Sequence, residues 1–131
     1  MEAWKNKMEI GIPSNIYREH LIELYKSPSN YGELKKANKE ATEHNSLCGD
    51  EITMQLIVKQ NKVEDIKFSG SGCVMSIVSA SMLTDKIKGL SVKEIKALSS
   101  KDILEMLKIK LNPARTKCAL LPLEAVRKAL G

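Results

Sequence analysis

The spacing of apolar residues changes several times along the chain, and each change predicts a new element. In the first stretch, aromatic and leucine residues recur at helical spacing. Ser14 is suited to cap this helix, and Pro28 predicts its end because the residue before a proline disfavours helical angles. The apolar residues of the predicted helix are Tyr17, Leu21, Leu24 and Tyr25.

From Ile52 the apolar period becomes two, which is typical of a strand with one buried face. Gln60-Asn61-Lys62 has the composition of a turn, after which the segment 63–68 would return as an antiparallel strand. Two strands alone are marginally stable, so we expect a third from the polar region 29–47. The residues predicted to face the core are Ile52, Met54, Leu56, Val58, Ile66 and Phe68.

After Gly72 the apolar period is helical again, and we predict a helix that ends at Gly89. Ser91 and Glu94 have the spacing of a capping box, which predicts a short helix after them. Ser100 is suited to cap the next helix. The apolar stripe of the first of these helices consists of Val74, Ile77, Val78 and Met82.

Asn112 followed by Pro113 predicts the start of the last helix, inside which Pro122 marks either a kink or the true beginning. The chain therefore orders an N-terminal helix, a three-stranded antiparallel sheet and several C-terminal helices. That order predicts an α+β fold in which the helices pack on the sheet.

The length of 131 residues fits one domain, and we predict an arm over residues 1–13 and the domain over 14–131. No apolar run approaches the roughly 18–20 residues of a membrane span, and the first residues lack a secretory apolar core. We therefore expect a cytoplasmic protein with no membrane partner.

The charge of +5 comes from 21 basic residues interspersed with 16 acidic ones. Because the chain has only five aromatic residues (one Phe, one Trp, three Tyr), we expect no nucleic-acid partner.

Three cysteines cannot all pair with one another, and each stands in a segment suited to a ligand. Cys48 is separated from Asp50 by a glycine, in a turn before a strand. Cys73 follows Gly70-Ser71-Gly72 at a strand-to-helix junction, where the positive end of the helix favours the thiolate. Cys118 stands near the start of the last helix. The alternative is that these cysteines are small buried hydrophobes.

The neighbours of these cysteines add little chemistry by themselves. Arg115 and Lys117 bring positive charge close to Cys118, although both are equally suited to a solvated surface. The serines of the helix after Cys73 most simply pack a small-residue face, and His44 is expected to be an exposed loop residue. The serines are Ser76, Ser79 and Ser81. The local sequences thus predict a metal site without naming its metal.

These segments resemble those of the U-type iron–sulfur cluster assembly scaffolds, the IscU, SufU and NifU N-terminal group. The segment 25–32 is similar to the family's Tyr-x-x-Pro-x-Asn-x-Gly, the segment 48–50 matches its Cys-Gly-Asp, and the segment 70–73 matches its Gly-x-Gly-Cys. Cys118 falls where the third ligand cysteine belongs. The resemblance runs from about residue 17 to residue 130.

The resemblance implies a scaffold rather than an enzyme, with a [2Fe–2S] cluster assembled on four ligands and released to carrier or apo iron–sulfur proteins. It implies a cysteine desulfurase as sulfur donor and Cys118 as the persulfide acceptor. A homo-oligomer is also compatible with the sequence. A hard carboxylate is a weak partner for a soft site, so we expect the aspartate to keep the cluster labile. The implied ligands are Cys48, Asp50, Cys73 and Cys118.

Two features depart from the housekeeping members of the family. Lys117 replaces their histidine before the third cysteine, and free lysine, with a pKa of about 10.4, is no resting ligand. The segment 111–115 replaces their Leu-Pro-Pro-Val-Lys docking sequence for a chaperone. Arg115-x-x-Cys118 is similar instead to the SufU branch, although the characteristic insertion of that branch is missing. Lys117 and Arg115 therefore remain candidate auxiliary groups.

Two other functions fit parts of the sequence. The first is a zinc-bound sulfur acceptor of the SufU type, because zinc or a single iron takes the same cysteine and aspartate ligands. The second is a basic adaptor module whose cysteines are merely buried, which would bind an acidic partner and no metal.

Overall fold

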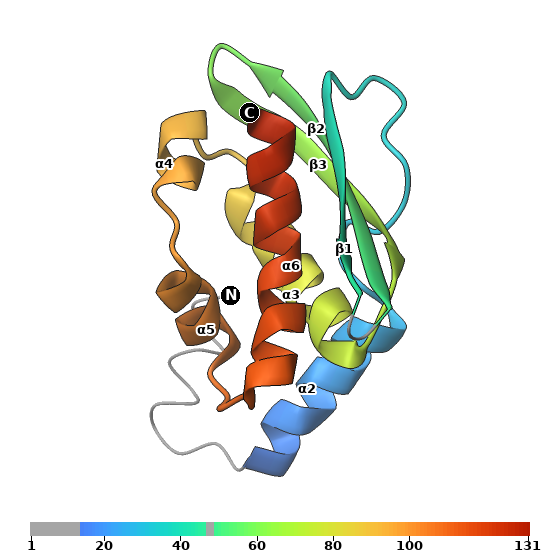
Figure 1. The fold of residues 1–131 in the computed structure, drawn as a ribbon. Helices are drawn as coiled ribbons and strands as arrows, with labels where there is room; N and C mark the ends of the chain where they lie inside the picture. Colours follow the sequence, from blue (N-terminus) through green and yellow to red (C-terminus); the bar gives the residue numbers. More distant parts are fainter. Residues whose placement is uncertain (1–13, 47–48) are drawn as a thin grey trace.

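The computed structural model describes residues 14–46 and 49–131, and it confirms the predicted α+β order. Figure 1 shows α3 and α6 against one side of the sheet, with α5 on the side of α6 away from it. The predicted arm over residues 1–13 lies outside the described residues. The elements are α2 (Ser14–Lys26), β1 (Lys39–Asn45), β2 (Asp50–Lys59), β3 (Lys62–Ser71), α3 (Val74–Ile87), α4 (Val92–Lys96), α5 (Ser100–Leu107) and α6 (Pro113–Leu130).

The sheet has the order β1-β2-β3 with both pairs antiparallel, and β1 is the expected third strand. Gln60 and Asn61 join β2 to β3 with φ angles of 52° and 62°. Two consecutive positive φ angles define the hairpin turn whose twist matches that of the strands. The pairing continues to the other end of the hairpin, where Glu51 faces Ser71. The start of β2 therefore lies beside the end of β3, and this juncture positions the site.

The core lies between the sheet and the two helices α3 and α6. Five of the six residues predicted to face inward from β2 and β3 are fully buried, whereas Val58, beside a shift in the strand register, is half-buried. Helix α3 is buried over nearly its whole length rather than along one stripe, and Val74, predicted to belong to that stripe, is exposed. The buried apolar residues of the two strands are Ile52, Met54, Leu56, Val63, Ile66 and Phe68.

The connection between α2 and β1 covers the outer edge of β3. The Phe68 N–H donates to the Asn30 carbonyl at 2.9 Å, and the Gly32 N–H donates to the Phe68 carbonyl at 2.9 Å. The Tyr31 ring meets the Phe68 ring edge to face, with ring centroids 5.2 Å apart. The Tyr31 hydroxyl donates to the Gly70 carbonyl at 2.9 Å. These bonds occupy backbone groups that would otherwise form an open edge, and they fix the end of β3.

Polar caps set the beginnings of the short helices. The predicted capping box of Ser91 and Glu94 is confirmed at α4. At α5 the cap is Ser99, whose side chain accepts from the Asp102 N–H, so the assignment of the cap to Ser100 is wrong by one residue. Ser99 and Ser100 are equally able to cap a helix through their hydroxyl groups. Ser99 is the cap because Asp102, three residues later, completes the capping box.

Helix α6 begins as predicted, with Asn112 accepting from the Arg115 N–H at 2.9 Å and Pro113 in the first turn. Pro122 lies inside this helix, so the alternative that the helix starts there is wrong. A proline in a helix interior removes one hydrogen bond of the helix. The apolar face of α6 packs on β1, β2 and α3, and burial of that face compensates for the loss.

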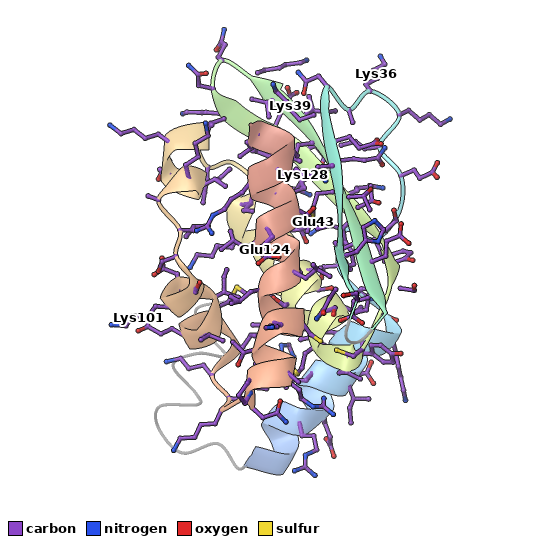
Figure 2. The ribbon with its side chains drawn as sticks, in the orientation of Figure 1. Lys36, Lys39, Glu43, Lys101, Glu124 and Lys128 are labelled. Atoms are coloured by element: carbon purple, nitrogen blue, oxygen red, sulfur yellow. The ribbon has the colours of Figure 1, made fainter. Side chains whose placement is uncertain are left out.

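The far end of α6 is tied to β1 by Lys128. Its ammonium donates to the Glu43 carboxylate and to the Thr42 carbonyl, each at 3.1 Å. Figure 2 shows Lys128 and Glu43 facing one another across the two elements. Because both side chains are partly exposed, the ion pair contributes at most about 1 kcal/mol. Packing, rather than charge, therefore holds α6 on the sheet.

Lysines lie toward both ends of the part of the molecule that the structure describes. In Figure 2, Lys36 and Lys39 lie at one end and Lys101 lies on α5 toward the other. This distribution agrees with the interspersed charges of the sequence. Among the helices of residues 14–46 and 49–131, none combines the length and the apolar character that crossing a bilayer would need.

Gly70 provides a test of the close packing between β2 and β3. A Cβ atom at Gly70 would lie 2.0 Å from the Glu51 carbonyl oxygen, and the φ angle of Gly70 is 137°. Gly89 is the matched control, because its φ angle is 90° and no atom lies within 4 Å of its Cβ position. Gly89→Ala should lose about 1–2 kcal/mol from backbone strain alone. Gly70→Ala should lose about 1–3 kcal/mol more, because the backbone must also move. Urea unfolding of both variants measures the difference, and equal losses would contradict the close approach.

Candidate metal centre

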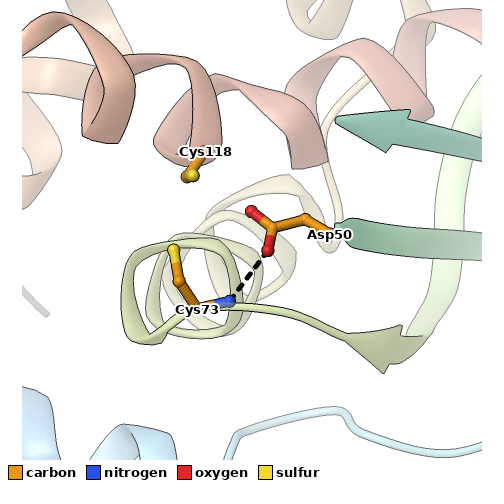
Figure 3. Close-up of side chains that lie close together, drawn as sticks. All are labelled: Asp50, Cys73 and Cys118. Atoms are coloured by element: carbon orange, nitrogen blue, oxygen red, sulfur yellow. Dashed lines mark hydrogen bonds between the residues drawn. The ribbon is translucent and has the colours of Figure 1, made fainter. Parts of the chain in front are cut away.

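Three segments that are far apart in the sequence bring two thiols and one carboxylate together. Asp50 is the first residue of β2, Cys73 precedes α3, and Cys118 lies in the second turn of α6. One carboxylate oxygen of Asp50 and the two Sγ atoms all lie within 4.8 Å of one another. Figure 3 shows the three side chains pointing into the same space between the strand end and the two helices.

The Asp50 carboxylate is buried and held by hydrogen bonds at both oxygens. The Cys73 N–H donates to Oδ1 at 2.9 Å, and the Ser76 hydroxyl donates to Oδ2 at 2.5 Å. Burial by itself raises the pKa of Asp50, but hydrogen bonds from Ser76, Cys118 and Cys73 outweigh burial and lower the pKa below its ordinary value. The carboxylate is therefore ionised at neutral pH, as a metal ligand must be.

Cys73 is the residue before the first turn of α3, with φ −72° and ψ 168°. The prediction that this thiol stands at a helix start is confirmed. The unpaired N–H groups of the first turn carry partial positive charge, and the Cys73 side chain lies beside them. Cys73 is half-buried, whereas Asp50 and Cys118 are each 1% exposed. Of these three residues, Cys73 is thus the most accessible to solvent.

Cys118 lies near the start of α6, as predicted. It lies in the second turn, however, and the electrostatic effect of a helix end falls off within the first turn. The helix end therefore acts on Cys73 and only weakly on Cys118. The amide of Asn45 donates to the Cys118 sulfur at 3.6 Å. The candidate auxiliary residues Arg115 and Lys117 are exposed on α6.

Two glycines allow the strand end to approach Asp50. Gly70 lies against the backbone of Glu51, and Gly72 lies against the Asp50 side chain. A Cβ atom at Gly72 would be 2.7 Å from Oδ1 of Asp50, which is closer than van der Waals contact allows. The Gly-x-Gly-Cys motif therefore has a steric reason in addition to the flexibility of its turn.

Cys48, the third predicted cysteine ligand, lies outside the described residues. The turn that contains it is described up to Ser46 and again from Gly49. Gly49 has a φ angle of 71°, and its N–H donates to the Asn45 carbonyl at 2.8 Å. Asn45 also pairs with Asp50, so both ends of the turn are fixed beside the metal-binding group.

The donor atoms suit a soft or borderline metal. In a tetrahedral zinc site, bonds of about 2.3 Å place two sulfurs about 3.8 Å apart. The donor atoms here lie within 4.8 Å of one another, so shifts of up to about 1 Å would let all three side chains bind one ion. Thiolates with a carboxylate suit iron or zinc rather than magnesium or calcium, whose ligands are oxygens.

Ser76 and Asn45 contact this group, and neither was predicted to do so. The helix serines were assigned to packing, which is correct for Ser79, whose hydroxyl donates to the Ala119 carbonyl at 2.6 Å. It is wrong for Ser76, which bonds to the Asp50 carboxylate. The sequence spacing could have indicated this contact. Ser76 is the third residue after Cys73, and residues three apart on a helix lie on the same face. His44 is exposed as predicted, but it lies in β1 rather than in a loop.

Comparison with known proteins identifies the family. The family model of the NifU-like N terminal domain matches residues 16–131, and the chain belongs to this family. The predicted resemblance is thereby confirmed.

Individual relatives carry more specific descriptions. The chain is 34% identical over 127 residues to "Iron-sulfur cluster assembly enzyme IscU" of Drosophila melanogaster, covering 92% of this chain and 80% of the relative. It is 32% identical over 133 residues to "Zinc-dependent sulfurtransferase SufU" of Bacillus subtilis, covering 88% and 90%. Among solved structures, a SUF-system scaffold candidate from Fervidobacterium islandicum AW-1 superposes with a TM-score of 0.73 at 26% identity, covering 85% and 93%.

Gly72 gives a direct test of the approach to Asp50. Gly72→Ala should push the carboxylate away from the two sulfurs, because the new methyl group would overlap its oxygen. We expect the affinity for zinc to fall about 10–100-fold, as for other changes beside a metal ligand. Competition of zinc with a chromophoric chelator measures the affinity. Gly89→Ala is the control, since Gly89 has open space around it. Unchanged zinc affinity in Gly72→Ala would contradict the assigned geometry.

Proposed function

We propose that this protein is a scaffold on which an iron–sulfur cluster is assembled from iron and persulfide sulfur and then passed to apo-proteins or carriers. The observation that carries the proposal is the convergence of one carboxylate oxygen and two thiol sulfurs within 4.8 Å. Relatives named as cluster assembly scaffolds, such as IscU of Thermotoga maritima at 34% identity, support it. In this role the protein holds the cluster while it is assembled and then passes it on, so it is a scaffold rather than an enzyme.

Cys48 is the fourth ligand in this proposal. It stands two residues before Asp50 in the sequence, in the Cys-Gly-Asp segment that matches the family. Three thiolates and one carboxylate would then hold the two irons of a [2Fe–2S] cluster. Arg115 and Lys117 remain candidate auxiliary groups outside this ligand set.

Asp50 would make the bound cluster easier to release. Clusters kept permanently usually have thiolates at all positions. A carboxylate oxygen is harder than a thiolate and binds an iron–sulfur centre more weakly. The same carboxylate already has hydrogen-bond partners in the protein, Cys73 and Ser76. Asp50 can therefore leave the iron for partners that are in place, which opens one coordination position to an acceptor.

Cys118 is the proposed sulfur acceptor. Its thiolate would attack the outer sulfur of the donor's persulfide, so that a new S–S bond forms while the donor's S–S bond breaks and its thiolate leaves. Each transferred sulfur then takes up two electrons from an external reductant to become sulfide. Cys118 is 1% exposed, so this step requires the site to open toward the donor.

The surface beside Cys73 is suited to a protein partner. Four large apolar side chains are exposed in the described residues, and three of them belong to α2 or to the turn that bonds to Gly70. The fourth follows Cys73 directly. Exposed apolar surface next to a half-buried thiol fits docking of a cysteine desulfurase or of a cluster acceptor. The four residues are Ile22, Tyr25, Tyr31 and Val74.

A zinc-bound sulfur acceptor is the second candidate function. The 32% identity to the zinc-dependent sulfurtransferase of Bacillus subtilis supports it, as does the Arg115-x-x-Cys118 sequence. The donor set suits zinc as well as iron. Under this function the protein would carry sulfur on a cysteine and would assemble no cluster.

Reconstitution distinguishes the two functions. We expect protein incubated anaerobically with ferrous iron, cysteine, a desulfurase and a thiol reductant to gain equal amounts of iron and acid-labile sulfide and the absorption of a [2Fe–2S] cluster. Asp50→Ala should form the cluster but hold it longer, and it should transfer it to an apo-ferredoxin about tenfold more slowly, because the exchangeable ligand through which the acceptor reaches the iron is lost.

The control is a Ser79→Ala variant, whose buried serine bonds to a carbonyl away from the metal-binding group. It should assemble and transfer the cluster at the wild-type rate. Tightly bound zinc that iron does not displace, with no sulfide gained, would favour the sulfur acceptor over the scaffold. An unchanged transfer rate in Asp50→Ala would contradict the role of the carboxylate in release.

A further inference from the structure

Ser76 contacts two of the proposed ligands from a fully buried position. Its hydroxyl oxygen is 2.5 Å from Oδ2 of Asp50 and 3.6 Å from Sγ of Cys73. Ser76 is 0% exposed and lies in the first turn of α3, one turn after Cys73. The residue therefore joins the carboxylate of β2 to the thiol at the start of α3 through a single oxygen atom.

The direction of these bonds follows from the chemistry of a hydroxyl. A serine hydroxyl has one hydrogen to donate and two lone pairs to accept. The shorter contact is with an ionised oxygen of Asp50, so the hydrogen is donated to Asp50. The lone pairs of the hydroxyl then remain available to the Cys73 thiol when that thiol carries its proton.

The second oxygen of Asp50 is held separately. The Cys73 N–H donates to Oδ1 at 2.9 Å, so each carboxylate oxygen accepts one hydrogen bond from the start of α3. The torsion that rotates a carboxylate is soft, and one bond alone would leave the group free to turn. Two donors, one at each oxygen, fix its plane. A carboxylate oxygen accepts two bonds, and thiols that bind a metal lose their protons and no longer donate, so lone pairs on Asp50 remain for a metal.

We propose that Ser76 is a positioning residue that orients the Asp50 carboxylate toward the metal. The inference rests on the proposed function, because it takes Asp50 as a ligand. Ser76 does not bind the metal itself. It fixes the plane in which Asp50 presents its free lone pairs to the space between the two sulfurs. Its loss would free the carboxylate to rotate about the bond from Cys73 and would leave Oδ2 without this donor.

Ser79 is a matched control on the same helix. It is also 0% exposed, and its hydroxyl also makes a short bond, to the Ala119 carbonyl at 2.6 Å. That bond joins α3 to α6 and does not reach Asp50. Replacing either serine with alanine removes one buried hydroxyl and one hydrogen bond, so both variants should lose similar stability. Only the Ser76 variant should alter metal binding.

The test is anaerobic titration with cobalt, which takes the ligands and geometry of zinc and absorbs visible light. The proteins are wild type, Ser76→Ala, Ser79→Ala, Asp50→Ala and the Asp50→Ala/Ser76→Ala double variant. Ser76→Ala should bind cobalt about tenfold more weakly, as is typical when a partner of a ligand is removed, and its visible bands should shift. Ser79→Ala should stay within about twofold of wild type, the scatter expected for an independent site.

The double variant tests whether Ser76 affects cobalt binding through Asp50. Once Asp50 is replaced, there is no carboxylate to orient, so adding Ser76→Ala should leave cobalt affinity within about twofold of Asp50→Ala alone. An equal tenfold loss in both backgrounds would overturn the inference, since Ser76 would then act on the thiols or on the fold. A loss in Ser79→Ala as large as in Ser76→Ala would overturn it as well.

Two further outcomes separate this inference from the proposed function. If wild type bound no cobalt, or if Asp50→Ala bound it as tightly as wild type, the proposed ligand set and the inference would fail together. If Asp50→Ala weakened binding while Ser76→Ala did not, only the inference would fail. Should Ser76→Ala not fold, Ser76→Thr keeps the hydroxyl and should bind cobalt within about twofold of wild type. A folded Ser76→Thr protein with a tenfold loss would contradict the inference.

Discussion

The structure around the site depends on one buried carboxylate. Asp50 is 1% exposed at the first residue of β2, and its oxygens accept hydrogen bonds from the beginning of α3. Burying an ionised group is costly unless its hydrogen bonds are made, so the strand and the helix must keep their mutual position. That requirement holds Cys73 beside Asp50. Gly72 is needed for the same reason, since a larger residue would occupy the space of the carboxylate.

The same constraint shows how a stable core could carry the proposed labile site. The sheet and α3 form a continuous apolar layer, and the candidate metal-binding group lies at one end of it, where β2 begins and β3 ends. Helix α6 brings Cys118 to the same place through packing that extends to Lys128 at its far end. Release of a metal from Asp50 therefore need not disturb the core, because Ser76 and Cys73 can hold the freed carboxylate.

The sequence predicted those features that depend on local spacing. The period-two pattern after Ile52 gave the strand, and the glycine turn before Cys73 gave a thiol at a helix start. Features that depend on tertiary contacts were harder to predict from the sequence. Two serines of one helix, each between apolar residues, have different partners, so Ser76 was not distinguished from Ser79. The meeting of Cys73 with Cys118 followed only from resemblance to a family, since no local rule relates residues on separate helices.

The central claim is that side chains from three separate segments bind one metal ion. X-ray absorption at the zinc edge of the zinc-loaded protein tests it most directly. The account predicts sulfur neighbours at about 2.3 Å together with one oxygen at about 2.0–2.2 Å, and loss of that oxygen from Asp50 when the residue is replaced by alanine. A zinc environment of nitrogen and oxygen alone, with no sulfur neighbour, would contradict the account.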